Sequence, residues 1–149
     1  MFAFNLESVE LNERPMPNGS IRFEFPLHSG VGTASIAAVL FELDPGNELA
    51  THMDSAEEVL LVLDGEGEVH VDGETIRVRA GDVALVPAMA PHGARAVGDS
   101  TLRVIGFFSS STVVSTFEEG IGPEGERVHV IGSTGTILAQ LPEPAALAA

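Results

Sequence analysis

The chain of 149 residues contains no cysteine and no lysine. Without cysteine, thiolate catalysis, disulfide bonds, iron–sulfur clusters and cysteine-ligated zinc are excluded. Without lysine, Schiff-base chemistry is excluded as well. A metal ion in this protein must therefore be held by histidine and carboxylate side chains.

Basic residues are scarce: seven arginines stand against 22 Asp and Glu residues, which gives a formal net charge of −15. The arginines are also scattered along the chain. Nucleic acids and anionic membranes bind clustered basic side chains, so neither is expected as a partner. The acidity itself fits a need for solubility or adaptation to a saline or GC-rich host.

Long apolar runs are missing, since none approaches the roughly 18 residues that a membrane-spanning helix needs. The opening stretch "MFAFNLESVELNERP" lacks the basic and then apolar regions of a secretory signal, and we expect a cytoplasmic protein. Hydrophobic residues make up 44% of the chain and charged residues 19%. This balance is typical of a globular domain with a substantial core.

Short runs with strand-like composition recur between Gly, Pro and Asp residues, while helical periodicity is weak throughout. The Asp-Gly pair within 71–74 predicts a tight hairpin turn, because these residues tolerate positive φ angles. The pattern predicts an all-β barrel or sandwich with few helices. The expected strands are 20–26, 33–46, 57–67, 68–74, 75–82, 83–88, 93–99 and 101–109.

The run "VLLVL" at 59–63 is apolar at every position, so both faces of this strand should be covered. A barrel interior would cover one face, and a second sheet or a second subunit would cover the other. We therefore expect a homodimer.

The chain is expected to form one barrel over residues 1–116, with its motifs between 46 and 96. Residues 117–149 are expected to form a C-terminal extension. Its glycine-rich and then Pro/Ala-rich composition predicts one extended piece around 127–132, followed by a poorly ordered end.

Two motifs carry the candidate chemistry. The first places a histidine, an aspartate and a glutamate between two glycines with the spacing G-x5-H-x-D-x3-E-x6-G. The second places a proline and a histidine after a glycine with the spacing G-x5-P-x4-H. The residues concerned are Gly46, His52, Asp54, Glu58 and Gly65 in the first motif, and Gly81, Pro87 and His92 in the second.

These spacings resemble the two motifs of the cupin superfamily, small single-domain members in particular. The sequence departs from the family pattern at three positions: Asp54 stands for the second histidine, Met89 for a glycine and Ala96 for an asparagine. The resemblance implies a double-stranded β-helix, or jelly-roll-like, barrel with a divalent metal near its centre. It also implies that His52, Glu58 and His92 are the metal ligands.

Two imidazoles and one carboxylate would form a 2-His-1-carboxylate site with open coordination positions. An oxygen-rich ligand set favours Fe²⁺ or Mn²⁺, while Zn²⁺ and Ni²⁺ also suit it. Asp54 is open to several interpretations: a fourth ligand, an acceptor for a ligating imidazole, a general base, or a residue that hydrogen-bonds the turn after it.

The other three histidines are not expected to be ligands. His28 reads as a loop residue that could line the mouth of a pocket. His70 and His129 each lie between two valines, so alternation predicts that they face solvent.

An apolar pocket wall is expected from Phe41, Met53 and Met89, although such residues are more often plain core. Phe23, Phe25, Phe107 and Phe108 are further candidates for the same wall. Ala94 and Ala96 share a face with His92 and would leave room beside the metal. A small, fairly apolar organic substrate fits this arrangement.

The favoured function is a metal-dependent enzyme with oxygenase-type chemistry, and a metal-assisted lyase or isomerase belongs to the same class. A non-catalytic module that binds a metal or a small ligand is the main alternative. A metal-free epimerase-like barrel is a third hypothesis, but it would not require His52, Glu58 and His92 together.

Overall fold

The computed structural model describes residues 2–132, and these form twelve strands with two short 3-10 turns. The turns are η1 (Leu6–Ser8) and η2 (Ser29–Val31). The prediction of an all-β protein with few helices is confirmed. Among the described residues, no helix is long and apolar enough to cross a membrane.

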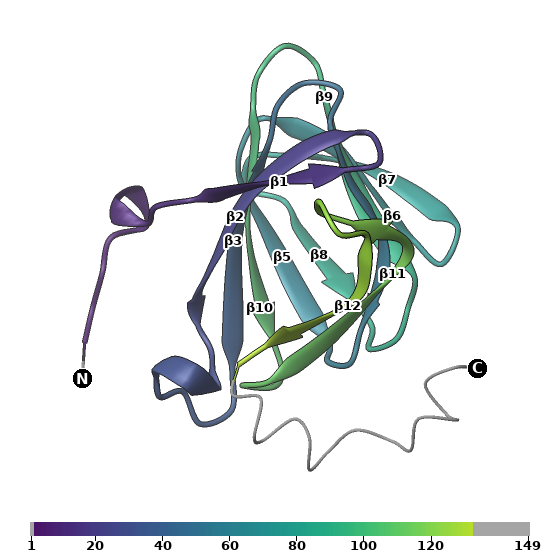
Figure 1. Cartoon of the computed structure of the whole chain (residues 1–149). Coiled ribbons are helices and arrows are strands. Elements are labelled where there is room, and N and C mark those ends of the chain that lie inside the picture. The colour runs from purple at the N-terminus through teal and green to yellow at the C-terminus, as the bar shows by residue number, and fades with distance from the viewer. Residues whose placement is uncertain (1, 133–149) are drawn as a thin grey trace.

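Two antiparallel sheets of six strands each pack face to face (Figure 1). Buried side chains between them form the core. The first sheet has the order β1 (Asn12–Met16), β2 (Gly19–Leu27), β3 (Ala37–Leu43), β10 (Leu102–Phe108), β5 (Glu58–Asp64) and β8 (Val83–Val86). The second has the order β12 (Glu126–Ile131), β11 (Val113–Ile121), β4 (Glu48–Asp54), β9 (His92–Val97), β6 (Glu66–Val71) and β7 (Glu74–Arg79).

The hairpin between β6 and β7 forms where the Asp-Gly pair predicts it. Asp72 and Gly73 have φ angles of 51° and 84°, the left-handed values that a type I′ turn requires at both central positions. The turn fixes the register of the pair, with Val71 opposite Glu74. Val69 and Val78 are buried as a result.

Strand alternation produces the core of the barrel. Leu60 and Val62 of β5 point inward and are buried. Phe41 of β3 and Phe108 of β10 are buried in the same core. Truncating a buried side chain of this size to alanine typically costs about 2–5 kcal/mol. The core therefore holds the two sheets at a fixed distance, and the site described below lies between them.

The outward face of β5 is only partly covered. Val59 is 38% exposed, and its register neighbours on the two adjacent strands, Leu85 and Phe107, are 58% and 40% exposed. These three side chains form a row across β8, β5 and β10. The strand is thus apolar on both faces, as its sequence indicates, and the outer row is accessible in the single chain.

Three strands lie outside the expected ranges, namely β1, β4 and β11. β1 carries charged residues and Pro15, and it lies at the edge of its sheet, where a residue without an N–H group is tolerated. β11 carries the acidic pair Glu118 and Glu119, and its pairing with β12 shifts register between Thr116 and Ile121. β1 and β11 lack the regular apolar alternation that would reveal them.

β11 runs across the expected boundary between residues 116 and 117. The extended piece expected around 127–132 is β12, which pairs with β11 in the second sheet. The poorly ordered end expected beyond it lies outside the described residues.

Candidate metal centre

Three neighbouring strands of the second sheet bring the polar side chains of the site into two rows. His52 of β4 lies directly opposite His92 of β9 and Phe117 of β11. Asp54, two residues after His52, lies opposite Ser115 of β11. Because side chains two residues apart share a face, all of these residues point into the barrel. His52, Asp54 and His92 are each buried.

Asp54 lies between the two imidazoles. Its Oδ2 is 3.5 Å from Nε2 of His52 and 3.2 Å from Nε2 of His92. Each of the three residues offers one ligand atom, and these atoms lie within 4.8 Å of one another. This cluster is the right size to hold one metal ion.

The backbone determines which nitrogen of each imidazole faces the cluster. Nδ1 of His52 lies 2.8 Å from the carbonyl of Ala50, and Nδ1 of His92 lies 2.9 Å from the carbonyl of Ala90. A carbonyl only accepts hydrogen bonds, so both Nδ1 atoms are donors. In the neutral ring this leaves a lone pair on Nε2 that points at Asp54.

A cation fits the space between these atoms. Asp54 Oδ2 and His92 Nε2 are buried and have no hydrogen-bond partner among the described residues. Two buried acceptors that face each other are unfavourable unless a proton or a metal ion lies between them. The donor set of imidazole nitrogen and carboxylate oxygen suits a divalent transition metal.

Glu58 approaches the same cluster from the opposite sheet. It is the first residue of β5 and is buried, with Oε1 3.9 Å from Nε2 of His92. Burial, together with the nearby charge of Asp54, raises the pKa of Glu58 to about 8. Glu58 fits beside β10 because Gly106 has no side chain: a Cβ there would lie 2.7 Å from Glu58 Oε2.

The surroundings of Asp54 and His92 favour their charged forms, in contrast to the surroundings of Glu58, which favour the neutral form. Burial alone would raise the pKa of Asp54, but the contacts and charge of the two imidazoles hold it below its usual range. Burial would lower the pKa of His92, but the contact with Asp54 raises it above normal. Ser115 also donates a hydrogen bond to Asp54 Oδ1. The surroundings therefore favour the charged form of Asp54 and the protonated form of Glu58 when no metal is bound.

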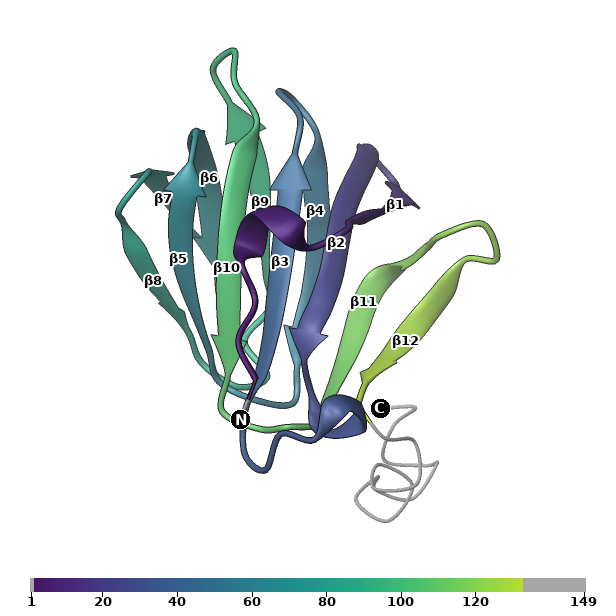
Figure 2. The ribbon, with the colours of Figure 1, turned by 90° about the vertical axis from the view of Figure 1, so that its left-hand side faces the viewer.

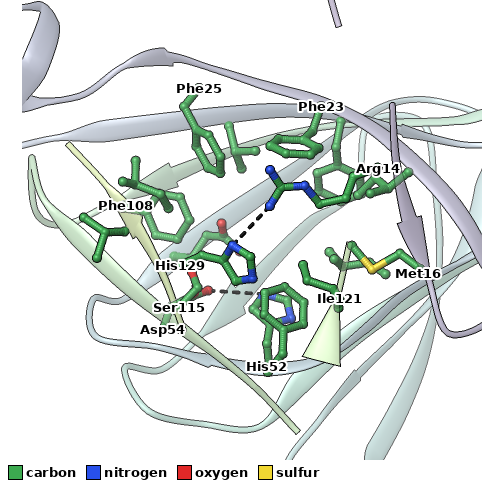
Figure 3. Close-up of a pocket in the computed structure, with 18 residues that line it drawn as sticks. Arg14, Met16, Phe23, Phe25, His52, Asp54, Phe108, Ser115, Ile121 and His129 are labelled. Atoms are coloured by element: carbon green, nitrogen blue, oxygen red, sulfur yellow. Dashed lines mark hydrogen bonds and ion pairs between the residues drawn. The ribbon is translucent and has the colours of Figure 1, made fainter. Parts of the chain in front are cut away.

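A cavity of about 300 Å³ opens beside the cluster (Figure 3). His52, Asp54 and Glu58 form its polar end. Its walls are mostly apolar and come from both sheets, and they include the phenylalanines Phe23, Phe25, Phe41, Phe108 and Phe117. Phe117 stacks on the His52 ring, with centroids 4.7 Å apart.

Of the expected pocket residues, Phe23, Phe25, Phe41 and Phe108 line this cavity, whereas Met53, Met89 and Phe107 do not. Met53 alternates with His52 and Asp54 and so lies on the other face of β4. Met89 is 56% exposed at the tip of a turn, with a φ of 64°. That angle explains why glycine is usual at this motif position. The Met89 backbone N–H donates to the carbonyl of Asp54 at 2.8 Å, which ties the turn to β4.

The prediction that His129 faces solvent is wrong, since His129 lines the cavity. Its neighbours Val128 and Val130 are 51% and 39% exposed. Alternation identifies two faces of a strand but not which one is inside, and β12 turns its histidine inward. Arg14, Ser115 and Phe117 also line the cavity and were not singled out from the sequence.

The two remaining histidines lie away from the cluster. His28 is a loop residue as predicted, and its Nδ1 accepts a hydrogen bond from the N–H of Gly30 at the start of η2. His70 lies on the outer face of the second sheet, but it is half-buried rather than fully solvated. Its Nε2 lies 2.9 Å from Thr51 Oγ1, and burial lowers its pKa.

Comparison with known proteins identifies the family. The profile of the Cupin domain family matches residues 39–108, a segment that includes His52, Asp54, Glu58 and His92. The dimethylsulfoniopropionate lyase DddW of Ruegeria pomeroyi is 33% identical over 112 residues, which are 73% of each chain. The protein is a cupin. A 5-nitrosalicylic acid 1,2-dioxygenase of a Bradyrhizobium species is 26% identical to this cupin over 140 residues, 85% of this chain and 68% of that protein.

Solved structures share the fold of this cupin. A predicted oxalate decarboxylase from Thermotoga maritima superposes with a TM-score of 0.66 at 18% identity, over 73% of this chain and 99% of that one. The cupin domain of Schizosaccharomyces pombe Cnp3 gives a TM-score of 0.62 at 21% identity, over 72% and 73% of the two chains. At these identities the likeness concerns the barrel alone.

Proposed function

We propose that this cupin is a metal-dependent enzyme that acts on a small organic molecule. One observation carries the proposal: Asp54 Oδ2 and His92 Nε2 face each other without hydrogen-bond partners, next to a largely apolar cavity. Such a pair is costly in a purely structural core but suits a cation. The cavity beside it has the volume of a pocket for a small molecule.

The proposed ligands are His52, Glu58 and His92, with Asp54 as a fourth. The two imidazoles and Asp54 form the compact part of the site, and Glu58 lies close enough to His92 to join them after a small side-chain movement. Two nitrogen and two carboxylate donors favour Fe²⁺ or Mn²⁺, and Zn²⁺ and Ni²⁺ are also suited to them. Such an ion supplies Lewis-acid chemistry, or redox chemistry with O₂ in the case of iron.

The chain itself would orient the substrate and keep water out. The aromatic walls pack against an apolar body, and Phe117 lies beside the His52 ring. Backbone carbonyls hold both imidazoles by Nδ1, so the rings keep their direction when a substrate enters. Ser115 holds Asp54 in the same way.

An oxygenase-type reaction is the first candidate, supported by the likeness to a protein named as a 5-nitrosalicylic acid 1,2-dioxygenase. A lyase reaction is the second, because the relative with 33% identity is named as a lyase. In the lyase case one of the two carboxylates, Asp54 or Glu58, would accept the proton removed from the substrate.

The test begins with metal content, measured by mass spectrometry on untagged protein purified without oxygen. The wild type should hold close to one transition metal per chain, His92→Ala should lose it, and the loop variant His28→Ala should retain it. Oxygen uptake with salicylate-type substrates, and anaerobic product formation from dimethylsulfoniopropionate, then separate the two reaction classes. Bound metal with no turnover of any tested compound would favour a non-catalytic binding module. No metal after reconstitution with Fe²⁺ and Mn²⁺ would refute the proposal.

We also propose that the protein forms a homodimer through the outer face of the first sheet. The row of Val59, Leu85 and Phe107 is accessible in the single chain, and apolar rows of this kind are typical of subunit interfaces. Light scattering should give twice the mass of the chain for the wild type. Leu85→Glu should give the mass of one chain with unchanged circular dichroism.

A further inference from the structure

An arginine and a histidine join the two sheets at the end of the cavity away from the cluster. Arg14 lies on β1, an edge strand of the first sheet, and His129 lies on β12, an edge strand of the second. Arg14 Nη1 is 3.1 Å from His129 Nδ1. Figure 2 shows the β1–β2 and β11–β12 hairpins on the same side of the barrel, and Figure 3 shows the guanidinium pointing into the cavity.

The contacts of His129 define its protonation. An arginine only donates hydrogen bonds, so Nδ1 of His129 is the acceptor. Nε2 lies 3.1 Å from the carbonyl of Glu126, which only accepts, so Nε2 carries the proton. These contacts fit the tautomer that carries its proton on Nε2. His129 positions the guanidinium without neutralising its charge.

Arg14 has no acidic partner among residues 2–132, although the whole chain has 22 acidic residues and seven arginines. The ion pairs that arginines form in the described part of the chain belong to Arg22, Arg77, Arg95 and Arg103. One N–H of Arg14 is used by His129, and its guanidinium lies 5.2 Å from the Phe23 ring centroid. Arg14 itself lines the cavity.

The two ends of the cavity thus differ in charge. The acidic side chains that line it, Asp54 and Glu58, both belong to the candidate metal centre. Phe117 separates the two ends: it stacks on His52 and meets the His129 ring edge-on, with centroids 5.4 Å apart. A molecule that spans the cavity would meet the metal centre at one end, aromatic walls in the middle, and an arginine at the other end.

We infer that Arg14, positioned by His129, binds the carboxylate of a small organic acid whose apolar body lies against the aromatic walls. The inference rests on the proposed function, because it places the rest of that acid at the metal centre. A guanidinium matches a carboxylate with two parallel hydrogen bonds, and the partly buried location strengthens them. One arginine balances a single negative charge, which favours a carboxylate over a phosphate.

Ligand-observed ¹⁹F NMR titration tests this inference on the metal-loaded protein. The probes are 4-fluorobenzoate and 4,4,4-trifluorobutyrate, each compared with its neutral amide. The wild type should bind at least one acid about 10-fold or more tightly than its amide. Arg14→Gln should remove this preference and leave the affinity for the amide unchanged, whereas Arg14→Lys should keep part of it. The matched control is Arg77→Gln, which alters an exposed arginine paired with Glu66.

The inference would be overturned if wild type and Arg14→Gln bind the acids with equal affinity. It would also be overturned if the wild type binds neither acid more tightly than its amide. If Arg14→Gln does not fold, His129→Leu replaces it and should reduce the preference, because Arg14 loses its positioning contact. Metal content is measured in every sample. An Arg14-dependent preference in a protein that binds no metal would support the anion site and refute the proposed function. Normal metal content without an Arg14-dependent preference would refute the anion site and leave the proposed function intact.

Discussion

Asp54 Oδ2 and His92 Nε2 lie 3.2 Å apart inside the barrel, each buried and each without a hydrogen-bond partner among the described residues. Asp54 and His92 come from strands that are paired through a bulged register, in which His52 and His92 stand opposite each other. The carboxylate of Asp54 therefore lies where both imidazoles direct Nε2. This makes Asp54, the residue that replaces the usual second histidine, central to the cluster.

Asp54→Asn tests that position. The change keeps the shape of the side chain but removes the negative charge between the imidazoles, so we expect metal affinity to fall by about 10-fold or more. Competition with a chelator measures this affinity, and the rise in melting temperature on metal addition provides a second readout. Asp64→Asn, an exposed change on the next strand, is the control. Unchanged metal affinity in Asp54→Asn would remove Asp54 from the ligand set.

The raised pKa of Glu58 predicts how the stability of the metal-free protein depends on pH. The pKa is about 8 in the folded state and near 4.5 in a free glutamate, so the folded state binds a proton that the unfolded state releases between these values. Folding stability should therefore fall as the pH rises from 4.5 to 8. The contribution of Glu58 to this fall should be no more than about 5 kcal/mol.

Urea unfolding of metal-free wild type and Glu58→Gln at pH 5 and pH 8 measures the effect. The wild type should lose stability between the two values, and the variant should lose less, because glutamine does not titrate. Asp54 does not contribute to this difference between pH 5 and pH 8. Its pKa is lowered in the folded state, so the stability that it contributes is lost only as the pH falls below the usual range of a carboxyl group. Equal slopes for the two proteins would show that Glu58 is not held in the protonated form.

The all-β fold and the main motif residues could be predicted because both depend on patterns within short stretches of the sequence. Glycine and Asp-Gly turns set the strand lengths, and alternation fixes which residues share a face. His52, Asp54 and Glu58 are close in the chain, and His92 follows at a spacing known from a family. The structure brings these four side chains together, while their roles as ligands remain a proposal.

The far end of the cavity could not be predicted in the same way. Arg14 and His129 are 115 positions apart and lie on edge strands of different sheets, so no local pattern relates them. Alternating valines suggested that β12 turns its histidine outward, but His129 lines the cavity. The orientation of an edge strand depends on what it covers, which is a property of the whole fold.

Ser115→Ala tests whether the support of Asp54 matters for metal binding. Ser115 donates to Asp54 Oδ1 and leaves Oδ2 for the cluster. Loss of a residue that orients a ligand typically lowers metal affinity by about 10-fold or more. Ser115→Thr should restore most of the affinity because it retains the hydroxyl, and the exposed change Ser100→Ala should have no effect. If Ser115→Ala binds metal as tightly as the wild type, the hydrogen bond has only a structural role.

Gly106→Ala tests how closely Glu58 is fitted into the barrel. A Cβ at Gly106 would lie 2.7 Å from Glu58 Oε2 and 3.0 Å from a methyl group of Val39, so the carboxylate must move. We expect a loss of about 1–3 kcal/mol in unfolding free energy, typical of overpacking.

The same glycine change in a Glu58→Ala background isolates the contact with the carboxylate. Its cost should be smaller there, because the nearest obstructing atom, Glu58 Oε2, is gone. Denaturant unfolding of the metal-free wild type, the two single variants and the double variant gives the coupling energy. A coupling energy near zero would mean that Glu58 can move away freely, and its place beside His92 would then not be fixed by the neighbouring strand.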